Sequence, residues 1–262
     1  MNRLFVIKIG GNVMDDESLL SVFLKDFASI QSPKILIHGG GGIATKIGDK
    51  LGIESKYTKG RRITDAETLN VVTMVYGGLI NKQLTARLQA LGCNAIGLTG
   101  ADGNLIKANK RPIKDIDFGF VGDLTAESIN SSLLVFLLKQ NLIPVFAPLT
   151  HGEGSMLNTN ADTIASAIAV SLSKHFDVRL IYCFEKKGVL KNLNDESSVI
   201  STLDSDQYKT LTEAGSFNDG IIPKLDNAFA AIQNGVKEVL IGDAKNLTGN
   251  LGTVTIGTLI KK

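Results

Sequence analysis

Residues 34–42 read KILIHGGGG, a short apolar run that ends in a histidine and four glycines before a helical pattern begins. The bare amide groups of glycine let an oxyanion approach closely, and the start of a helix favours negative charge. A strand, a glycine turn and a helix start in this order predict an anion-binding turn. The simpler alternative is a tight turn between strand and helix, with His38 bracing it.

An earlier stretch, FVIKIGG at residues 5–11, has the same arrangement, with Lys8 set into the apolar run. Burying an unpaired lysine is costly, so Lys8 needs either a partner or a solvent-facing position at the strand end. Neighbouring parallel strands would bring both glycine turns to the same carboxyl edge of the sheet, where open α/β sheets bind ligands. Together the two stretches favour an oxyanion site beside Lys8.

Short apolar runs alternate with longer helical patterns along the whole chain. The predicted strands are 4–9, 34–38, 94–99, 142–147, 178–184, 238–242 and 253–256. The predicted helical segments are 15–30, 43–51, 65–91, 125–140, 160–176 and 223–235. This alternation indicates an α/β fold with a mainly parallel sheet covered on both faces. Because no linker interrupts it, we expect residues 1–262 to form a single domain, with hairpins at 100–123 and 151–159.

The bulk composition excludes several classes of protein. The chain has 262 residues, 44% of them hydrophobic and 21% charged, and a formal net charge of +2, so we expect no nucleic-acid partner. Its two cysteines, Cys93 and Cys183, lie in apolar runs and favour a reducing compartment. The most apolar region, 131–149, is interrupted by Lys139 and two prolines, and is unsuited to crossing a membrane. With a strand starting so near Met1, no signal peptide is expected, and the predicted location is the cytoplasm.

Three further stretches carry candidate site residues. LNTNAD at 157–162 sets asparagines and an aspartate at a strand-to-helix junction. NDGIIPKLDNA at 218–228 places Lys224 in the first turn of a helix, where a cation opposes the helix dipole. GRRITDAE at 60–67 places two arginines before a helix start, as suits gripping a carboxylate. The alternatives are helix caps for the asparagines and solvated positions for the cations.

Two familiar phosphate-binding patterns fit poorly. A P-loop requires a Gly-Lys dipeptide, and the chain contains none. Gly39, Gly41 and Ala44 match the loose dinucleotide pattern, but no acidic residue follows at the distance that a ribose contact requires. A dinucleotide-dependent oxidoreductase therefore remains only as an alternative, and it leaves Lys8 unexplained.

The motifs KIGG, HGGG, GRRITD, NTNAD and DGIIPK, taken in this order from Leu4 to about Ile256, resemble the amino-acid kinase family. Within it, the chain is similar to the N-acetylglutamate kinase branch. The resemblance implies a three-layer αβα sandwich around an open, mainly parallel sheet. It further implies an N-terminal lobe, about 1–174, that binds the acylamino acid, and a C-terminal lobe, about 175–262, that binds the nucleotide.

The resemblance also implies a role for each matching position. Lys8 and Lys224 would stabilise the transition state, and Asp162 would orient them. The residues implied to bind the acylglutamate are Gly40, Gly41, Arg62, Asn158 and Asn160. Those implied to contact the nucleotide are Gly10, Gly11, Glu185, Gly188, Asp219 and Gly220. ATP would bring Mg²⁺ on its phosphates, and no protein metal site is expected.

The implied reaction is the ATP-dependent phosphorylation of the side-chain carboxylate of N-acetyl-L-glutamate in arginine biosynthesis. A carboxylate is ionised near pH 7, so no general base is needed. Two departures leave questions open. FEKKG at 184–188 replaces the usual Ser/Thr-Asp-Val-x-Gly turn, which leaves the choice of nucleotide open. Arg61 stands where the family commonly has an apolar residue, which raises N-succinyl-L-glutamate as an alternative acceptor unless Arg61 faces solvent.

A sister kinase acting on an aminoadipate derivative and an inactive amino-acid sensor also stay open as functions for this chain. Family members that form arginine-inhibited hexamers carry an extra helix before the first strand. Because the predicted first strand begins close to Met1, we expect a homodimer that arginine does not inhibit, joined through the 65–91 helix.

Overall fold

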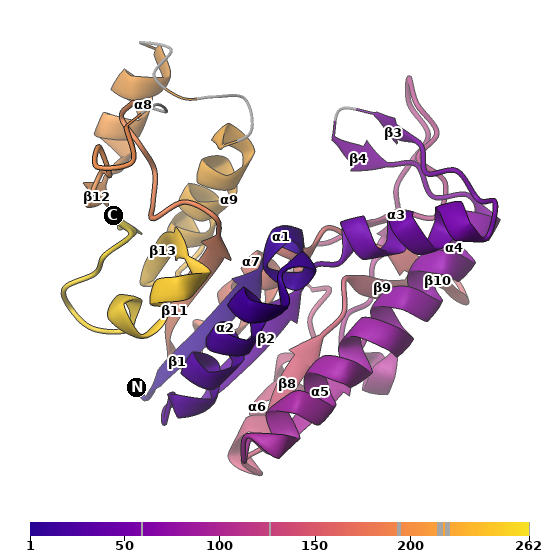
Figure 1. The fold of residues 1–262 in the computed structure, drawn as a ribbon, viewed down its shortest axis with the longest axis horizontal. Helices are drawn as coiled ribbons and strands as arrows, with labels where there is room; N and C mark the ends of the chain where they lie inside the picture. Colours follow the sequence, from indigo (N-terminus) through magenta and orange to yellow (C-terminus); the bar gives the residue numbers. More distant parts are fainter. Residues whose placement is uncertain (59, 126, 193–194, 214–216, 218–220, 262) are drawn as a thin grey trace.

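The computed structural model describes every residue except 59, 126, 193–194, 214–216, 218–220 and 262. Its centre is an eight-stranded sheet in the order β12-β14-β13-β11-β1-β2-β8-β5 (Figure 1). These strands are β1 (Arg3–Ile9), β2 (Lys34–His38), β5 (Ala95–Leu98), β8 (Ile143–Phe146), β11 (Asp177–Phe184), β12 (Thr202–Leu203), β13 (Glu238–Asp243) and β14 (Thr258–Ile260). The pairs are parallel apart from β13 with β14. The predicted parallel sheet is confirmed.

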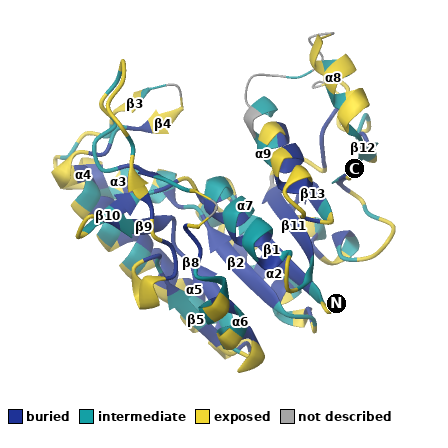
Figure 2. Cartoon of the chain, turned by 180° about the vertical axis from the view of Figure 1, so that it is seen from behind, coloured by how far each residue is buried: buried dark blue, intermediate teal, exposed yellow. Residues whose placement is uncertain are grey.

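Helices cover both faces of this sheet. They are α1 (Gly11–Asp15), α2 (Glu17–Ser29), α3 (Gly41–Lys50), α4 (Ala66–Val72), α5 (Asn81–Ala90), α6 (Ser131–Lys139), α7 (Ala161–Leu172), α8 (Ser205–Glu213) and α9 (Ile222–Gln233), with a π-helix, η1 (Thr73–Ile80), joining α4 to α5. Along β1, Leu4 and Val6 pack into the core under α6, α7 and α9, whereas Phe5 and Ile7 pack into the core under α2, α4 and α5. Figure 2 shows the buried strands between these two helical layers. The three-layer sandwich is thus confirmed.

Small hairpins extend beyond the main sheet, two of them as expected from 100–123 and 151–159 and a third, at 57–62, not predicted. They pair β3 (Tyr57–Thr58) with β4 (Arg61–Arg62), β6 (Asn109–Lys110) with β7 (Gly122–Asp123), and β9 (Leu149–Gly152) with β10 (Ser155–Asn158). Single bridges from Thr64 to Gly119 and from Val121 to Asn158 tie the three hairpins together. Segments distant in sequence therefore meet at one end of the sheet.

The predicted strand at 253–256 is wrong, because the pairing strand is β14 at Thr258–Ile260. The Oδ1 of Asn250 accepts hydrogen bonds from the backbone amides of Ile256 and Gly257, at 3.0 and 2.9 Å, so a side chain replaces the strand ladder there. A Cβ on Gly257 would lie 2.4 Å from the Ile241 carbonyl, so the chain crosses the sheet too closely for another residue type. The alternation of apolar residues at 253–256 gives no sign of the Asn250 hydrogen bonds or of the close crossing at Gly257.

Other boundaries shifted for local reasons. The helix expected from residue 125 begins at Ser131, because the Asn130 side chain accepts from the amide of Leu133 and caps α6. α8 and β12 were not predicted, and α8 contains no fully buried residue whose periodicity would mark it. The 3-10 turns η2 (Asp102–Asn104), η3 (Ala244–Asn246) and η4 (Thr248–Asn250) were not predicted either.

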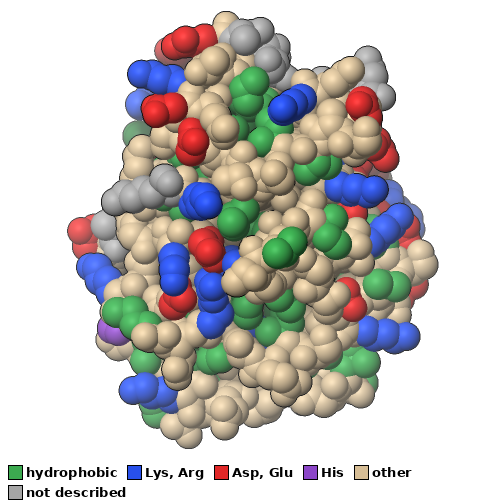
Figure 3. All heavy atoms as spheres, turned by 90° about the vertical axis from the view of Figure 1, so that its left-hand side faces the viewer, with side chains coloured by type: hydrophobic (Ala, Val, Ile, Leu, Met, Phe, Trp, Pro, Cys, Tyr) green, Lys and Arg blue, Asp and Glu red, His purple; other side chains and the backbone are tan. Residues whose placement is uncertain are grey.

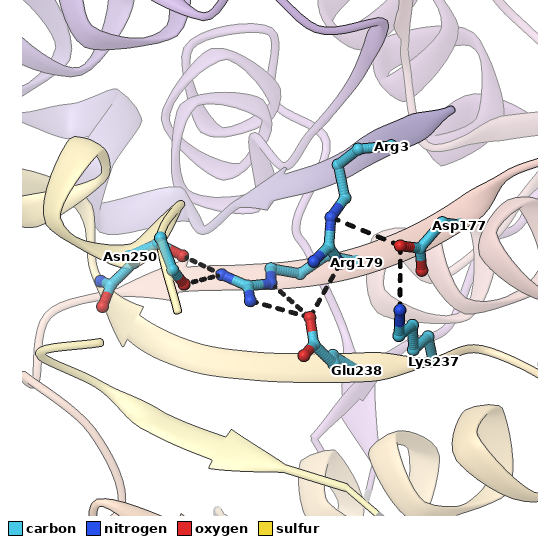
Figure 4. A network of polar contacts seen from close by, with 7 residues as sticks. Arg3, Asp177, Arg179, Lys237, Glu238 and Asn250 are labelled. Carbon is cyan, nitrogen blue, oxygen red and sulfur yellow. Dashed lines mark hydrogen bonds and ion pairs between the residues drawn. The ribbon is translucent and has the colours of Figure 1, made fainter. Parts of the chain in front are cut away.

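A polar network holds the opposite end of the sheet together (Figure 4). The Arg179 side chain, only 1% exposed, contacts Glu238 through Nη2 at 2.8 Å and donates through Nη1 to the Asn250 and Gly252 carbonyls. Glu238 also pairs with Arg3 at 2.8 Å, which links the first residues of β1 and β13. Because Glu238 and the two carbonyls satisfy the buried Arg179 charge, the network anchors η4 at the sheet without leaving that charge unpaired.

Figure 3 shows the left-hand side of Figure 1, where α8, β12 and both chain ends lie. Lysine and arginine side chains alternate there with acidic ones, and apolar side chains gather between them. Among the side chains coloured in that view, no broad surface of one sign is seen, in line with the formal net charge of +2. No helix in the described residues is long and apolar enough to cross a membrane.

Candidate active site

The two glycine turns lie side by side at the carboxyl edge of β1 and β2. The amide of Gly39 donates to the Ile9 carbonyl at 3.1 Å, and a Cβ on Gly39 would lie 3.3 Å from the Gly11 nitrogen. A Cβ on Gly11 or on Gly41 would instead meet none of the described atoms within 4 Å, so both residues face open space. The predicted meeting of the two turns is confirmed.

Gly40 can only be glycine. Its φ is +150°, and a Cβ there would lie 2.4 Å from Cδ1 of Ile80 and 3.3 Å from the Tyr76 ring. It is the N-cap of α3, and no side chain in the described part of the chain caps that helix. The first amides of α3 are therefore left for another acceptor, with the helix dipole behind them.

Lys8 is paired and largely shielded from solvent. On β1 it shares a face with Leu4 and Val6, which α7 covers, and its Nζ lies 2.7 Å from Oδ1 of Asp162 in the first turn of α7. The two side chains are 12% and 14% exposed. The solvent-facing alternative for Lys8 is wrong. The Asp162 carboxylate therefore supplies the partner that a largely buried lysine requires.

A cavity of about 590 Å³ opens in front of the glycine turns. Seven of the residues expected at the site line it: Lys8, Gly11, Gly40, Gly41, Arg62, Asn158 and Asn160. Its other walls include Arg61, Tyr57 and Tyr76, and residues from the hairpin that carries Arg111. A concave space of this size, polar on one side and aromatic on another, suits a small polar acid.

Arg62 supplies a buried positive charge to this cavity. Its Nη2 donates to the Gly41 carbonyl and to Oγ1 of Thr45, both at 2.9 Å, and its guanidinium stacks 4.8 Å over the Tyr57 ring. Its Nη1 contacts the Ser55 hydroxyl. All these acceptors are neutral, and no carboxylate of the described residues forms an ion pair with Arg62. A carboxylate ligand would supply the missing counter-charge.

The two asparagines have different local roles. Asn158 ends β10, and its Nδ2 donates to Oγ1 of Thr64 at 3.0 Å. Asn160 is the N-cap of α7, and its Oδ1 accepts from the amide of Thr163 at 3.0 Å. The cap alternative therefore holds for Asn160, which nevertheless also lines the cavity. Asn160 thus sets the start of the helix that carries Asp162.

Arg111 was missed from the sequence. Its Nη2 lies 2.5 Å from Oδ1 of Asp123, its guanidinium stacks 5.1 Å over the Phe118 ring, and both Arg111 and Asp123 line the cavity. The pair forms because β6 and β7 are antiparallel, with Asn109 opposite Asp123. The loop between β6 and β7 is long and irregular, so the sequence does not predict which residues of the two strands lie opposite each other.

The residues expected to contact the nucleotide are less closely grouped. Gly10 donates from its amide to the Cys183 carbonyl at 3.2 Å, and Glu185 is exposed just after β11. Gly188 is buried, and a Cβ there would lie 2.7 Å from Oγ1 of Thr258, so packing alone requires this glycine. Asp219 and Gly220 lie outside the described residues.

Lys224, the second expected catalytic lysine, is half-buried in the first turn of α9. In the FEKKG departure, Lys186 is engaged with Glu196 at 2.6 Å. No group of three or more His, Cys, Asp or Glu side chains within the described ranges has the arrangement of a metal site.

An open, mainly parallel sheet with two glycine turns at one carboxyl edge, a paired lysine and a buried arginine is typical of α/β enzymes that bind a small anionic ligand at that edge. The model of the amino acid kinase family matches residues 3–243, and the chain belongs to that family.

Its curated relatives include the protein named acetylglutamate kinase from Cytophaga hutchinsonii, 55% identical over 261 residues that cover 98% of each chain. A second, from Phocaeicola vulgatus, bears the same name and is 54% identical, covering 96% of this chain and 98% of its own. Among solved structures, smu.665 from Streptococcus mutans UA159 matches with a TM-score of 0.77 and 29% identity, covering 99% of this chain and 98% of its own.

Proposed function

We propose that this chain is an acetylglutamate kinase, a phosphotransferase that moves the γ-phosphoryl group of ATP to the side-chain carboxylate of N-acetyl-L-glutamate. Full-length relatives of that name at 54–55% identity support the proposal. The single structural observation that carries it is the cavity, which both Lys8 and Arg62 line. Lys8 is paired with Asp162, whereas no carboxylate of the described residues pairs with Arg62.

In this reaction Arg62 holds the α-carboxylate of the acceptor, with Asn158 beside it. The open amides of Gly40 and Gly41 bind the acceptor at the start of α3. The acceptor's side-chain carboxylate is ionised at neutral pH and attacks the γ-phosphorus directly, so no base removes a proton. As the new P–O bond forms, the bond from phosphorus to the β-phosphate oxygen breaks and ADP leaves.

The obstacle to this attack is the repulsion between two anions. Lys8 and the Gly11 turn lie at the shared edge of the sheet and stabilise the transferring phosphoryl group, and Lys224 does so from α9. Asp162 keeps the Lys8 ammonium aimed at that position. Mg²⁺, carried on the ATP phosphates, neutralises part of their charge.

The lobes divide the substrates in this proposal. Residues up to about 174 hold the acylglutamate. Residues from about 175 hold ATP through Glu185, Gly188, Asp219 and Gly220, and Gly10 contacts it from the end of β1. The enzyme works in the cytoplasm as a homodimer. The helical run α4–η1–α5 supplies the subunit contact, where Met74 and Leu79 are 55% and 41% exposed.

A coupled assay of ADP release tests this function. Purified protein is given ATP, Mg²⁺ and, in parallel, N-acetyl-L-glutamate, N-succinyl-L-glutamate and N-acetyl-L-2-aminoadipate. We expect N-acetyl-L-glutamate to give the highest kcat/KM, since the curated relatives are named for it and do not favour the succinyl alternative. The proposal would be overturned if none of the three acids caused ADP release. It would also be overturned if a parallel reaction without coupling enzymes changed the absorbance of NAD(P)H.

A further inference from the structure

A fully buried histidine lies directly behind the second glycine turn. Nδ1 of His38 is 2.7 Å from the Gly39 carbonyl, and its Nε2 is 3.2 Å from Nδ2 of Asn81. A carbonyl can only accept, so Nδ1 carries the proton and Nε2 accepts from the amide. Burial lowers the pKa of His38 to about 4, so the ring is neutral when the enzyme works.

Asn81 is itself fully buried. Its Nδ2 also donates to the Val145 carbonyl at 2.9 Å, whereas its Oδ1 has no hydrogen-bond partner among the described residues. An orphaned buried oxygen costs free energy, whereas the two hydrogen bonds donated by Nδ2 satisfy the buried His38 ring and the Val145 carbonyl. The amide at position 81 is therefore better explained by the two groups to which it donates, one of them the His38 ring, than by packing.

The backbone around Asn81 is unusual as well. Asn81 begins α5 directly after the π-helix η1, a rare form that often marks functional sites. Its wider turn brings Tyr76 and Ile80 against Gly40 while Asn81 faces His38. From the other side, a Cβ on Gly97 would lie 2.2 Å from Oδ1 of Asn81, so a glycine in β5 leaves room for the amide.

We propose that Asn81 is a positioning residue which, through His38, sets the direction of the amides that bind the acceptor. The planar peptide between Gly39 and Gly40 makes this coupling direct, because its carbonyl and its N–H point in opposite directions. When His38 holds the Gly39 carbonyl on the buried side, the Gly40 amide turns away from His38. This inference rests on the proposed function, which assigns Gly40 and Gly41 to the acceptor.

The kinetic test compares two buried asparagines with a volume-conserving change. Asn81→Leu should raise KM for N-acetyl-L-glutamate by about tenfold or more and leave KM for ATP within about twofold, because only the acceptor amides are misaligned. The matched control is Asn250→Leu, which removes an equally buried amide from the other half of the chain. It should leave the acceptor KM within about twofold. Equal acceptor KM values in the two variants would overturn the inference.

A second variant disturbs the Asn81 side chain without replacing Asn81. Gly97→Ala places a methyl group against Oδ1 of Asn81, and we expect the same selective rise in acceptor KM. An unchanged acceptor KM in folded Gly97→Ala would count against the proposal.

A measurement on the wild-type protein needs no variant. The ¹⁵N shifts of the His38 ring should show the Nδ1–H tautomer and no titration between about pH 5.5 and 8. An Nε2–H tautomer, or a midpoint near the ordinary value of about 6.5, would overturn the proposal even if Asn81→Leu failed to fold. A wild type inactive on every acceptor would instead remove the proposed function and leave the tautomer result standing.

Discussion

The two glycine turns share one sheet edge but are supported in different ways. Gly10 and Gly11 are backed by main-chain bonding to β11, and the charge beside them is Lys8, held by Asp162. The turn at Gly39–Gly42 has a neutral, buried backing of His38 and Asn81, and its charge comes from Arg62 on a separate hairpin. The first turn is built around a fixed cation, which suits the phosphoryl transfer proposed for it. The second is built around oriented amides, which suits the acceptor binding proposed for it.

Removing the lysines should have the largest effect. Lys8→Ala and Lys224→Ala should each lower kcat by about 100-fold or more, since each removes positive charge that the transition state needs. Steady-state kinetics at saturating ATP and N-acetyl-L-glutamate measures this, with circular dichroism to show that the fold is intact. Retention of more than about a tenth of wild-type kcat in either variant would remove that lysine from the proposed role.

Removing the charge at the second turn should act on one substrate. Arg62→Ala should raise KM for N-acetyl-L-glutamate by roughly 30-fold or more, because a bidentate charge-assisted contact is lost, with a far smaller change in KM for ATP. Initial rates with each substrate varied in turn give both constants. Equal rises in the two KM values would mean that Arg62 only holds the Gly41 turn in place.

The neutral backing of the second turn predicts a pH dependence of stability. The unfolded chain protonates His38 near pH 6.5 but the folded chain only near 4, so stability is complete above 6.5 and falls as pH drops toward 4. The full loss is about 3 kcal/mol. Urea unfolding from pH 7 to 4.5 should show a steeper loss in wild type than in His38→Gln. Parallel curves for the two proteins would contradict it.

The smallest effect is expected at Arg61. It is exposed, whereas Arg62 beside it on β4 is buried, although both line the cavity. Arg61→Leu should therefore change kcat/KM for N-acetyl-L-glutamate by less than about threefold. The same kcat/KM should be measured for N-succinyl-L-glutamate in wild type and in Arg61→Leu. A preference for the succinyl compound that disappears in Arg61→Leu would show that Arg61 binds a second carboxylate.

Much of this architecture could be read from the sequence because its signals are local. The run KILIH predicted β2 to the residue, since a strand buried on both faces is apolar throughout. Parallel neighbours then place both glycine turns at one edge, which the structure confirms. The strand expected at 253–256 failed because a side chain of Asn250 and a close crossing at Gly257 decide that segment.

By itself, the sequence determined the apolar periodicity, the glycine turns, the cations and the order of motifs that marks the family. Only the tertiary structure decided which polar groups meet. It brought Arg111 to Asp123 through a hairpin register, and Asn81 to His38 through a π-helix. The difference lies in how far along the chain each kind of interaction reaches. Burial patterns and turn chemistry act within a few residues, whereas a hydrogen bond between residues 43 positions apart depends on how whole elements pack.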